Sequence, residues 1–346
     1  MTTAPSPPIP ARGIATQRTF GVTGANGFVG SNLCRHLLAA GHRVRGLVRA
    51  DADRRFIAGL NDLTLCVGAL DDPASLRQAF AGCDCVVHTA ARTADWGAWD
   101  LFEQTNVRGV ALVLAAAQDA GVKRLIHLSS VSVYGFPGAT DITEEHPWLL
   151  WPRDPYVTSK QRGERLAREA HGNGIEVVVL RPGGLYGPND HVTSAPLFAA
   201  LERGRLPLVD AGRHVMAPAF VDNLVQAIWL AATTQANTGG NAYNIADDGR
   251  TTWREYLGWA SEDLGCQPPT LSLPSAIALP LAAVTEDLSR WMFPKRMPPL
   301  TRYRIRAVMA DSHYSCQRAR AELGYAPMVT TRDGLRRTVA WYRSTH

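Results

Sequence analysis

Lysine is scarce in this chain of 346 residues, and cysteine follows no regular spacing. Only Lys123, Lys160 and Lys295 are lysines, whereas the other 33 basic residues are arginines. The six cysteines include no CxxC pair, which argues against a zinc or redox-dithiol site, and we predict no metal site. The longest apolar run of interest, Ala276–Val284, has nine residues broken by Pro280 and is too short to span a bilayer.

The first 18 residues contain four prolines and lack the apolar stretch that a signal peptide requires. We therefore expect a loose leader over residues 1–18 and a cytoplasmic protein. The net charge is +5, and residues 286–346 alone hold 12 basic and 5 acidic side chains. Basic segments of this kind can bind nucleic acid or an anionic membrane surface. We favour a solvated basic surface that binds no nucleic acid, and a peripheral membrane contact remains open.

Short apolar runs alternate with amphipathic stretches from residue 19 onward. This alternation predicts an α/β protein of Rossmann type, in which helices cover both faces of a doubly wound parallel sheet. The carboxyl ends of parallel strands form one edge, where ligands bind. The expected strands are Thr19–Thr23, Arg43–Val48, Leu63–Val67, Cys85–Thr89, Arg124–Ser129 and Glu176–Leu180, and the expected helices are Phe28–Ala40, Pro73–Phe80, Trp99–Ala120 and Tyr156–His171.

The pattern changes after Pro182, where strand-like pieces shorten and proline and glycine become frequent. We expect residues 19–182 to form the sheet domain and residues 183–346 a smaller mixed α/β lobe, with some of its segments returning to the sheet. The apolar segment Leu271–Pro299 fits either the core of this lobe or a lid over a bound substrate.

A glycine-rich stretch at residues 23–30, TGANGFVG, follows the first expected strand and opens the first helix. Gly24 permits a tight turn, Gly27 allows the backbone to approach a pyrophosphate, and Gly30 permits close packing of the helix on the strand. The start of the helix offers unpaired N–H groups and a partial positive charge to phosphates. The strand–turn–helix context therefore predicts a dinucleotide-binding domain.

The end of the second strand indicates which dinucleotide is preferred. An acidic residue there binds the ribose 2′-hydroxyl, whereas an arginine pairs with a 2′-phosphate. Here the strand is followed by Arg49, which can bind a phosphate bidentately with help from Arg54 or Arg55. We therefore predict NADP(H) as the preferred cofactor. NAD(H) remains open, because Asp51 and Asp53 lie close by in the sequence.

Tyr156 and Lys160 lie four residues apart, so they share one face of the expected helix. A tyrosine with a pKa near 10 is a poor acid–base catalyst at pH 7, and lowering that pKa by about three units requires roughly 4 kcal/mol. A lysine ammonium and the charge of an oxidised nicotinamide can supply this together. A compact ammonium suits the task, and it occurs here in a chain that otherwise uses arginine. We predict Tyr156 and Lys160 as catalytic residues.

Four further stretches match a known superfamily: HTAA at 88–91, NVRG at 106–109, SSVSVYG at 129–135 and RPGGLYGP at 181–188. With the glycine loop and the Tyr156/Lys160 pair, they resemble the extended short-chain dehydrogenase/reductase superfamily over nearly all of residues 19–342. The resemblance implies that hydride passes between nicotinamide C4 and a ketone or secondary alcohol, with Tyr156 exchanging the proton. It also implies that Lys160 anchors the ribose.

The resemblance assigns the remaining site residues. Ser130 is expected to polarise the substrate carbonyl, with Ser129 and Ser132 as competing assignments, and Asn106 is expected to be structural. Ala69 departs from the family pattern, which has an aspartate near the adenine, so that contact would pass to Leu70 and the backbone. The residues expected to bind the cofactor are Gly24, Gly27, Phe28, Val29, Gly30, Arg49, Leu70, Ala90, Lys160 and Pro182.

The substrate class depends on the second lobe. Nucleotide-sugar epimerases and dehydratases of the superfamily carry an arginine that holds a pyrophosphate, and Met216 stands in its place here. An apolar side chain cannot replace that charge. Arg213 and His214 lie near enough in sequence to compensate, so the nucleotide-sugar alternative remains open.

The stretches FVDN at 220–223, PPLT at 298–301 and AELGY at 321–325 look more like the 3β-hydroxysteroid dehydrogenase family, which includes sterol C4-decarboxylating dehydrogenases. That resemblance implies a bulky apolar substrate of steroid, sterol or 3-keto acid type. The apolar segment Leu271–Trp291 fits such a substrate, and Trp96 and Trp99 could form part of its wall. The direction of the reaction and a homodimer remain open.

A non-catalytic dinucleotide-binding regulator is a further alternative, because some members of the superfamily bind the cofactor without turning over a substrate. The intact Tyr156/Lys160 pair argues against this alternative, since a sensor does not need a proton donor.

Overall fold

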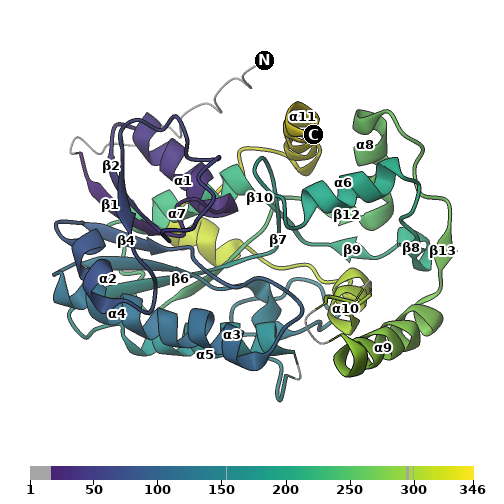
Figure 1. Ribbon diagram of the computed structural model, residues 1–346, viewed down its shortest axis with the longest axis horizontal. Coiled ribbons are helices and arrows are strands. Elements are labelled where there is room, and N and C mark those ends of the chain that lie inside the picture. The colour runs from purple at the N-terminus through teal and green to yellow at the C-terminus, as the bar shows by residue number, and fades with distance from the viewer. Residues whose placement is uncertain (1–16, 153, 294–295, 299) are drawn as a thin grey trace.

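A central sheet of seven strands runs through the computed structural model, which describes residues 17–152, 154–293, 296–298 and 300–346. All seven strands are parallel and lie in the order β11-β6-β5-β4-β1-β2-β3 (Figure 1). They are β1 (Thr19–Thr23), β2 (Arg43–Val48), β3 (Leu63–Val67), β4 (Cys85–His88), β5 (Arg124–Leu128), β6 (Glu176–Pro182) and β11 (Ala242–Ile245). The Rossmann-type α/β class is confirmed.

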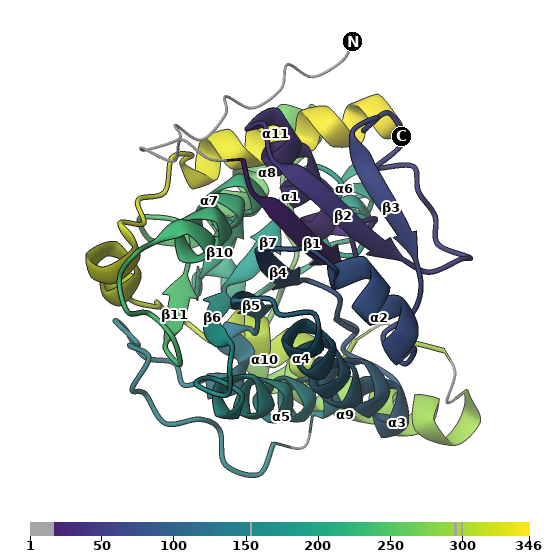
Figure 2. The same cartoon turned by 90° about the vertical axis from the view of Figure 1, so that its left-hand side faces the viewer.

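Helices cover both faces of this sheet (Figure 2). One face carries α1 (Phe28–Ala39) and α7 (Val221–Thr233), and the opposite face carries α2 (Pro73–Phe80), α4 (Gly109–Asp119) and α5 (Pro155–Glu169). Two separate apolar cores fill the layers, because the strands are buried on both sides. The sequence also explains where α2 begins. The side chain of Asp72 accepts hydrogen bonds from backbone N–H groups of the first turn, and Pro73 is the first residue of the helix.

The helix predicted over Trp99–Ala120 is continuous but not uniformly α-helical. It comprises α3 (Trp99–Glu103), a π-helical turn at Gln104–Arg108, and α4. Asn106 lies in the π turn, where its amide exchanges two hydrogen bonds with the backbone of Arg92 and donates a third to Ser159 Oγ. These tertiary bonds account for the local widening, which periodicity alone could not reveal.

The second half of the chain forms a lobe beside the carboxyl edge of the sheet (Figure 1). Its β11 returns to the central sheet beside β6. The other strands form pairs, β7 (Gly184–Tyr186) with β10 (Pro218–Phe220), β9 (Val215–Met216) with β12 (Thr251–Thr252), and β8 (Leu208–Val209) with β13 (Ser272–Leu273). The helices of the lobe are α6 (Ser194–Glu202), α8 (Trp253–Leu264), α9 (Ser275–Met292), α10 (Arg302–Met309) and α11 (Thr331–Thr345).

The lobe has two apolar clusters. One joins α6, α8 and α11, and a smaller one joins α9 and α10 to β8. Across the residues that the structure describes, no helix combines the length and apolar character needed to cross a membrane. Residues 1–16 of the predicted leader lie outside the described residues.

Candidate active site

The glycine loop joins β1 to α1, and two of its glycines stand where a larger residue would be strained or would clash with the backbone. Gly24 has a φ of +65°, and a Cβ there would stand 3.0 Å from the backbone of Ala90. A Cβ on Gly30 would lie 2.1 Å from the carbonyl oxygen of Gly24, so the helix packs directly on the loop. A Cβ on Gly27 would meet only that same oxygen within 4 Å, which leaves its other side open to a ligand. This cradle fits the pyrophosphate of a dinucleotide.

The amino end of α1 points its peptide groups toward this cradle. Gly27 precedes the helix, and no side chain caps its first turn at Phe28 and Val29. The helix start therefore retains hydrogen-bond donors and a partial positive charge for phosphates. Asn32, one turn further on, connects α1 to the second lobe by donating a hydrogen bond to the carbonyl of Pro188. It also donates to the carbonyl of Phe28 within the helix.

The other residues expected to bind the cofactor lie where strands end. Ala90 follows β4 and is held against the glycine loop, since its N–H donates to Thr23 Oγ1. Pro182 is the last residue of β6. Leu70 follows β3 and packs against the start of α4 at Gly109. The structure therefore brings these side chains to the carboxyl edge, as the topology predicted.

Arg49 follows β2 with its side chain largely exposed, and its Nε lies 3.4 Å from Asp51 Oδ1. Asp53 pairs instead with Arg55 at 2.5 Å. The loop is close to the glycine loop, because Asn26 donates a hydrogen bond to the carbonyl of Asp53. Exposed ion pairs of this kind are weak, so Arg49 is available to a phosphate.

Helix α5 positions the Tyr156/Lys160 pair. Asp154 caps the helix by accepting hydrogen bonds from the N–H groups of Tyr156 and Val157, and Pro155 begins it. Lys160 is buried, and its Nζ donates to the carbonyl oxygen of Leu128 at 2.9 Å, which fixes α5 to the end of β5. Burial lowers the pKa of Lys160 to about 8, while the carboxylate of Glu164 acts in the opposite direction.

The three candidate serines after β5 face different surroundings. Ser129 is buried and donates to Glu164 Oε2 at 2.6 Å, away from the phenol of Tyr156. Ser130 is partly buried and Ser132 is buried, and the hydroxyl of each lowers the pKa of that phenol. Burial raises the pKa of Tyr156, and the hydroxyl of Ser130 is the strongest influence that lowers it. Ser130 therefore stays the predicted carbonyl-binding serine, with Ser132 as the competing assignment.

Two aromatic rings that the sequence did not indicate lie next to Tyr156. Tyr303, on α10, meets the ring of Tyr156 edge-on at 6.0 Å between centroids, and Phe136 meets Tyr303 at 5.3 Å. Thr301 and Arg304 bind Asp95, which follows β4 in the chain, so α10 is fastened to the sheet domain. The ring of Tyr303 therefore bounds Tyr156 on the side of the second lobe, and Phe136, from the segment between β5 and α5, packs against Tyr303.

A buried ionic network supports α5 from behind. Arg181, on β6, forms a bidentate pair with Glu164 on α5, and both side chains are almost fully buried. Arg181 also donates to the hydroxyl of Tyr134, which donates in turn to Asn244 Oδ1 on β11. One signal for this network was present in the sequence, because an arginine in an otherwise apolar strand needs a buried partner.

Met216 is partly buried against the apolar cluster of the second lobe. The two residues that could compensate for the missing arginine are both turned toward Asp210: His214 Nε2 lies 2.9 Å from its carboxylate and Arg213 lies 3.6 Å away. The imidazole of His214 is therefore held within the lobe, whereas the pair of the exposed Arg213 is weak, so the argument against the pyrophosphate of a nucleotide sugar at this position rests on Met216.

The two tryptophans proposed as substrate walls each lie against an arginine. The guanidinium of Arg162, on α5, lies 4.8 Å from the ring of Trp99, and that of Arg290, on α9, lies 5.4 Å from the ring of Trp96. Trp96 therefore joins the loop after β4 to α9.

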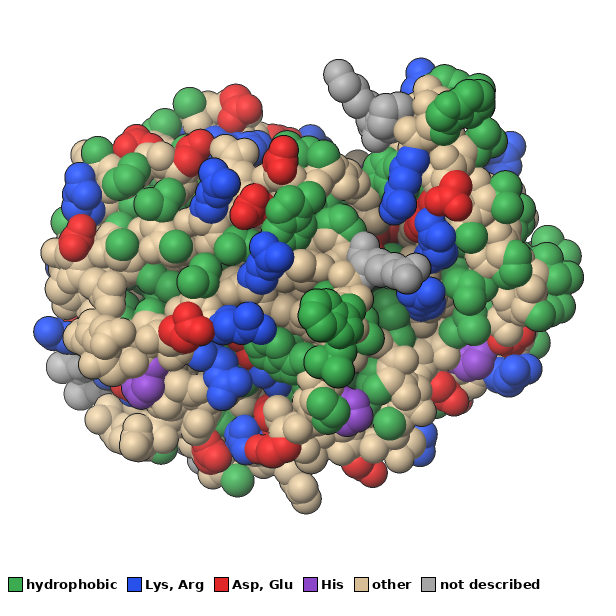
Figure 3. All heavy atoms as spheres, turned by 90° about the horizontal axis from the view of Figure 1, so that it is seen from below, with side chains coloured by type: hydrophobic (Ala, Val, Ile, Leu, Met, Phe, Trp, Pro, Cys, Tyr) green, Lys and Arg blue, Asp and Glu red, His purple; other side chains and the backbone are tan. Residues whose placement is uncertain are grey.

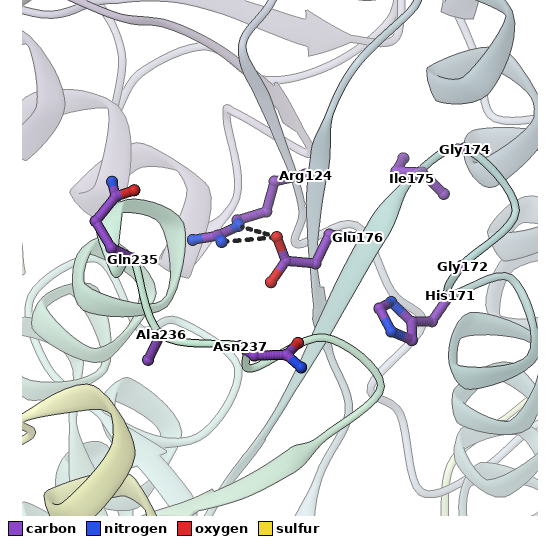
Figure 4. A pocket seen from close by; sticks show the side chains of 9 residues that line it. All are labelled: Arg124, His171, Gly172, Gly174, Ile175, Glu176, Gln235, Ala236 and Asn237. Atoms are coloured by element: carbon purple, nitrogen blue, oxygen red, sulfur yellow. Dashed lines mark hydrogen bonds and ion pairs between the residues drawn. The ribbon is translucent and has the colours of Figure 1, made fainter.

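A separate pocket of about 430 Å³ lies at the opposite edge of the sheet, where β5 and β6 begin (Figure 4). Arg124 and Glu176 pair across it at 2.7 Å, so its charged groups already satisfy one another. It contains none of the predicted site residues. Within the part of the chain that the structure describes, no cluster of three or more histidine, cysteine or acidic side chains could hold a metal ion.

Comparison with known proteins places the chain in a family. A model described as the NAD dependent epimerase/dehydratase family matches residues 21–246. Over 320 residues the chain is 32% identical to the 4-hydroxy-2-methyl-3-oxo-4-farnesyl-3,4-dihydroquinoline-1-oxide ketoreductase of Stigmatella aurantiaca, which covers 92% of this chain and 94% of that protein. It is 30% identical to the 2-alkyl-3-oxoalkanoate reductase of Stenotrophomonas maltophilia, covering 92% and 98%.

A human relative is relevant to the predicted resemblance to sterol C4-decarboxylating dehydrogenases. The chain is 29% identical to the human decarboxylating sterol-4-alpha-carboxylate 3-dehydrogenase, covering 93% of this chain and 87% of that protein. Among solved structures, the UDP-glucuronic acid 4-epimerase of Bacillus cereus in complex with NAD has a TM-score of 0.75 at 22% identity, covering 94% and 99%. That identity supports the shared fold alone. The resemblance to the extended short-chain dehydrogenases, with sterol dehydrogenases among the relatives, is confirmed.

Proposed function

Because this chain belongs to the NAD dependent epimerase/dehydratase family, we propose that it is an NADPH-dependent oxidoreductase that interconverts a ketone and a secondary alcohol on a bulky apolar substrate. One observation carries the proposal. Tyr156 lies one helical turn before the buried Lys160, its phenol pKa is lowered by the hydroxyl of Ser130, and its ring packs edge-on against that of Tyr303. This arrangement combines a proton donor, a hydrogen-bond donor for a carbonyl, and an apolar wall.

Each group has a definite role in reduction. Ser130 donates a hydrogen bond to the substrate carbonyl oxygen and withdraws charge from it. Tyr156 transfers its phenolic proton to that oxygen, and the ammonium of Lys160 favours the phenolate that remains. When bound in the glycine cradle, the nicotinamide cofactor supplies the hydride. Oxidation of an alcohol uses the same groups in reverse, with Tyr156 accepting the proton.

Three observations support an apolar substrate over a nucleotide sugar. Met216 stands where a pyrophosphate-binding arginine would be needed, and the neighbouring His214 is bound to Asp210. The ring of Tyr303 packs edge-on against Tyr156, and the ring of Phe136 packs against Tyr303. The relatives named above are described as acting on a farnesylated quinoline oxide, an alkylated oxoalkanoate and a sterol carboxylate, which are all bulky and largely apolar.

The cofactor preference rests on Arg49. No carboxylate ends β2, and the exposed Arg49 guanidinium can exchange Asp51 for the 2′-phosphate of NADPH. A bidentate contact of arginine with phosphate is stronger than an exposed pair with a carboxylate.

The deciding experiment measures NADP-coupled and NAD-coupled turnover with a panel of sterols, steroids, 2-alkyl-3-oxoalkanoates and a UDP-sugar. We expect turnover with a steroid, sterol or 3-keto acid and none with the UDP-sugar. Epimerisation of the UDP-sugar would overturn the substrate class. Tight NADPH binding without turnover of any ketone or alcohol would instead favour a regulator.

A further inference from the structure

Helix α9 presents a continuous apolar stripe to solvent. Its exposed positions recur every three or four residues, so they lie on one face of the helix: Ile277, Leu281, Val284, Leu288 and Trp291. The opposite face holds Ala278 and Ala282, which are fully buried against β8 and α10. Met292, the last residue of the helix, is also exposed, as are Phe293 and Met297 beyond it. We call this surface the α9 face.

Basic residues outnumber acidic ones in the segment that forms the α9 face, and among its described residues Arg290, Arg296 and Arg306 have no ion pair, whereas Arg302 and Arg304 do. Residues 275–306 contain six basic and two acidic residues. The two acids, Glu286 and Asp287, both pair with Arg302 of α10. Figure 3 shows hydrophobic side chains on the lobe projecting at the upper right, with Lys and Arg and some Asp and Glu side chains beside them. The net charge of this surface is therefore positive.

We propose that the α9 face is a docking surface for an anionic lipid bilayer, on which α9 lies in the plane of the interface. The chemistry of the surface favours this partner over a protein groove. A helix with an apolar stripe, basic residues beside it and aromatic side chains at one end is typical of interfacial membrane helices. Trp291, which is 82% exposed, has the amphipathic ring that accumulates at the level of lipid headgroups. Apolar patches of this extent are uncommon on monomeric soluble proteins.

Helix α10 connects the α9 face to the candidate active site. Helix α9 packs against α10, and α10 carries Tyr303 to the ring of Tyr156. A bilayer that holds α9 would thus lie on the same helical pair that bounds the site. Docking does not depend on turnover, so the proposal can fail or stand independently of the proposed function.

The test is flotation of the full chain with vesicles of phosphatidylcholine alone and of phosphatidylcholine mixed with phosphatidylglycerol. We expect binding to the anionic vesicles, and weaker binding as salt increases. Replacing Leu281, Val284 and Leu288 together by serine should lower the partition constant at least tenfold, because apolar area no longer enters the interface. The Arg290→Gln/Arg296→Gln double variant should bind several-fold less tightly and with a weaker dependence on salt.

Val192→Ser provides the matched control, because Val192 is 64% exposed and Val284 is 63% exposed. It should float as the wild type does, whereas Val284→Ser alone should float less. All variants replace exposed side chains, and a thermal melt checks that each remains folded. The proposal is overturned if the wild type fails to float with anionic vesicles, or if the serine variant floats equally well. It is also overturned if light scattering shows that those serines convert a dimer to a monomer, since the face would then be an interface between two copies.

Discussion

Tyr156 depends on its neighbours to act as an acid near neutral pH. Burial raises the pKa of its phenol, and Ser130 only partly opposes that effect. Lys160 remains largely charged at pH 7, because its pKa is lowered only to about 8. We predict that Tyr156→Phe lowers kcat by 10² to 10⁴-fold, since the proton donor is lost while the ring stays. Steady-state oxidation of NADPH with the best ketone of the panel measures this.

Tyr303→Phe is the control for that substitution, because Tyr303 contributes its ring to the site and Tyr156 its hydroxyl. It should keep most of the wild-type kcat. A Tyr156→Phe enzyme that retains most of its kcat would refute the assignment of the proton donor. Comparison of Ser130→Ala with Ser132→Ala tests the serine in the same assay, and the larger loss is expected for Ser130.

The second prediction at the scale of residues concerns Arg49 and the preference for NADPH over NADH. Arg49→Ala should lower kcat/KM for NADPH at least tenfold and leave that for NADH nearly unchanged, because only NADPH carries the 2′-phosphate. Arg55→Ala is the control, since Arg55 is paired with Asp53, and a smaller change is expected. Initial rates with each cofactor measure both effects. Preference for NADH in the wild type, together with no effect of Arg49→Ala on NADPH use, would exclude the proposal.

Local spacing predicted only part of the candidate site. The glycine loop and the Tyr156/Lys160 pair were accessible because each depends on residues within about two helical turns of one another. Tyr303 was not, since it reaches Tyr156 through the folding of α10 over the sheet, 147 positions further along the chain. Nothing in a single sequence fixes such a contact.

At the scale of elements, the strands and helices of the sheet domain agree closely with their predicted bounds. The apolar runs of a parallel sheet are buried on both faces, so their ends are sharp in the sequence. The prediction was less accurate where side chains bond across elements. The π-helical turn at Asn106 depends on Arg92 and Ser159, and α9 continues to Met292 beyond the apolar run that ends at Val284.

The Glu164–Arg181 pair allows a prediction about how α5 is held. Glu164→Gln should lower the free energy of unfolding by about 3 kcal/mol or more, because removing one partner leaves a buried charge without compensation. Arg181→Met should lower the free energy of unfolding by a similar amount, because it leaves the carboxylate of Glu164 buried without its partner. Urea denaturation followed by far-UV circular dichroism measures both.

The double variant Glu164→Gln/Arg181→Met distinguishes pairing from simple loss of packing. If the pair is the main contribution, the double variant should be more stable than the sum of the two single losses predicts. Strict additivity of the two effects would show that the buried ion pair does not couple α5 to β6.

At the scale of the whole molecule, many of the arginines form ion pairs with acidic side chains of the same chain. Arg332 pairs with Glu262 and Asp263, and Arg337 pairs with Asp222, so much of the basic character of α11 fixes that helix to the rest of the protein. Around α9, Arg302 and Arg304 are paired in the same way, but Arg290, Arg296 and Arg306 have no ion pair among the described residues. A net charge of +5 therefore gives little information about partners until it is divided among surfaces.

Two buried histidines make the stability of the whole molecule sensitive to acid. His88 and His127 stack on neighbouring strands at 5.7 Å between ring centroids, near Lys160. Burial, with the ammonium of Lys160 adding to it, lowers the pKa of His88 to about 3, and burial lowers that of His127 well below its usual value. In the unfolded chain both titrate near pH 6.5. Acid therefore protonates the unfolded state first, and stability should fall from about pH 6.5 toward pH 3.

His127→Leu tests this linkage, because neither ring nitrogen of His127 has a hydrogen-bond partner among the described residues. Near pH 8 the substitution should change the free energy of unfolding little, since it removes an unsatisfied polar group. Between pH 6.5 and 4 the variant should lose less stability than the wild type, by up to about 1.4 kcal/mol per pH unit. Urea titrations across this range measure the slope, with His313→Leu as the control at a partly exposed histidine. Equal slopes for wild type and His127→Leu would mean that His127 binds its proton equally well in both states.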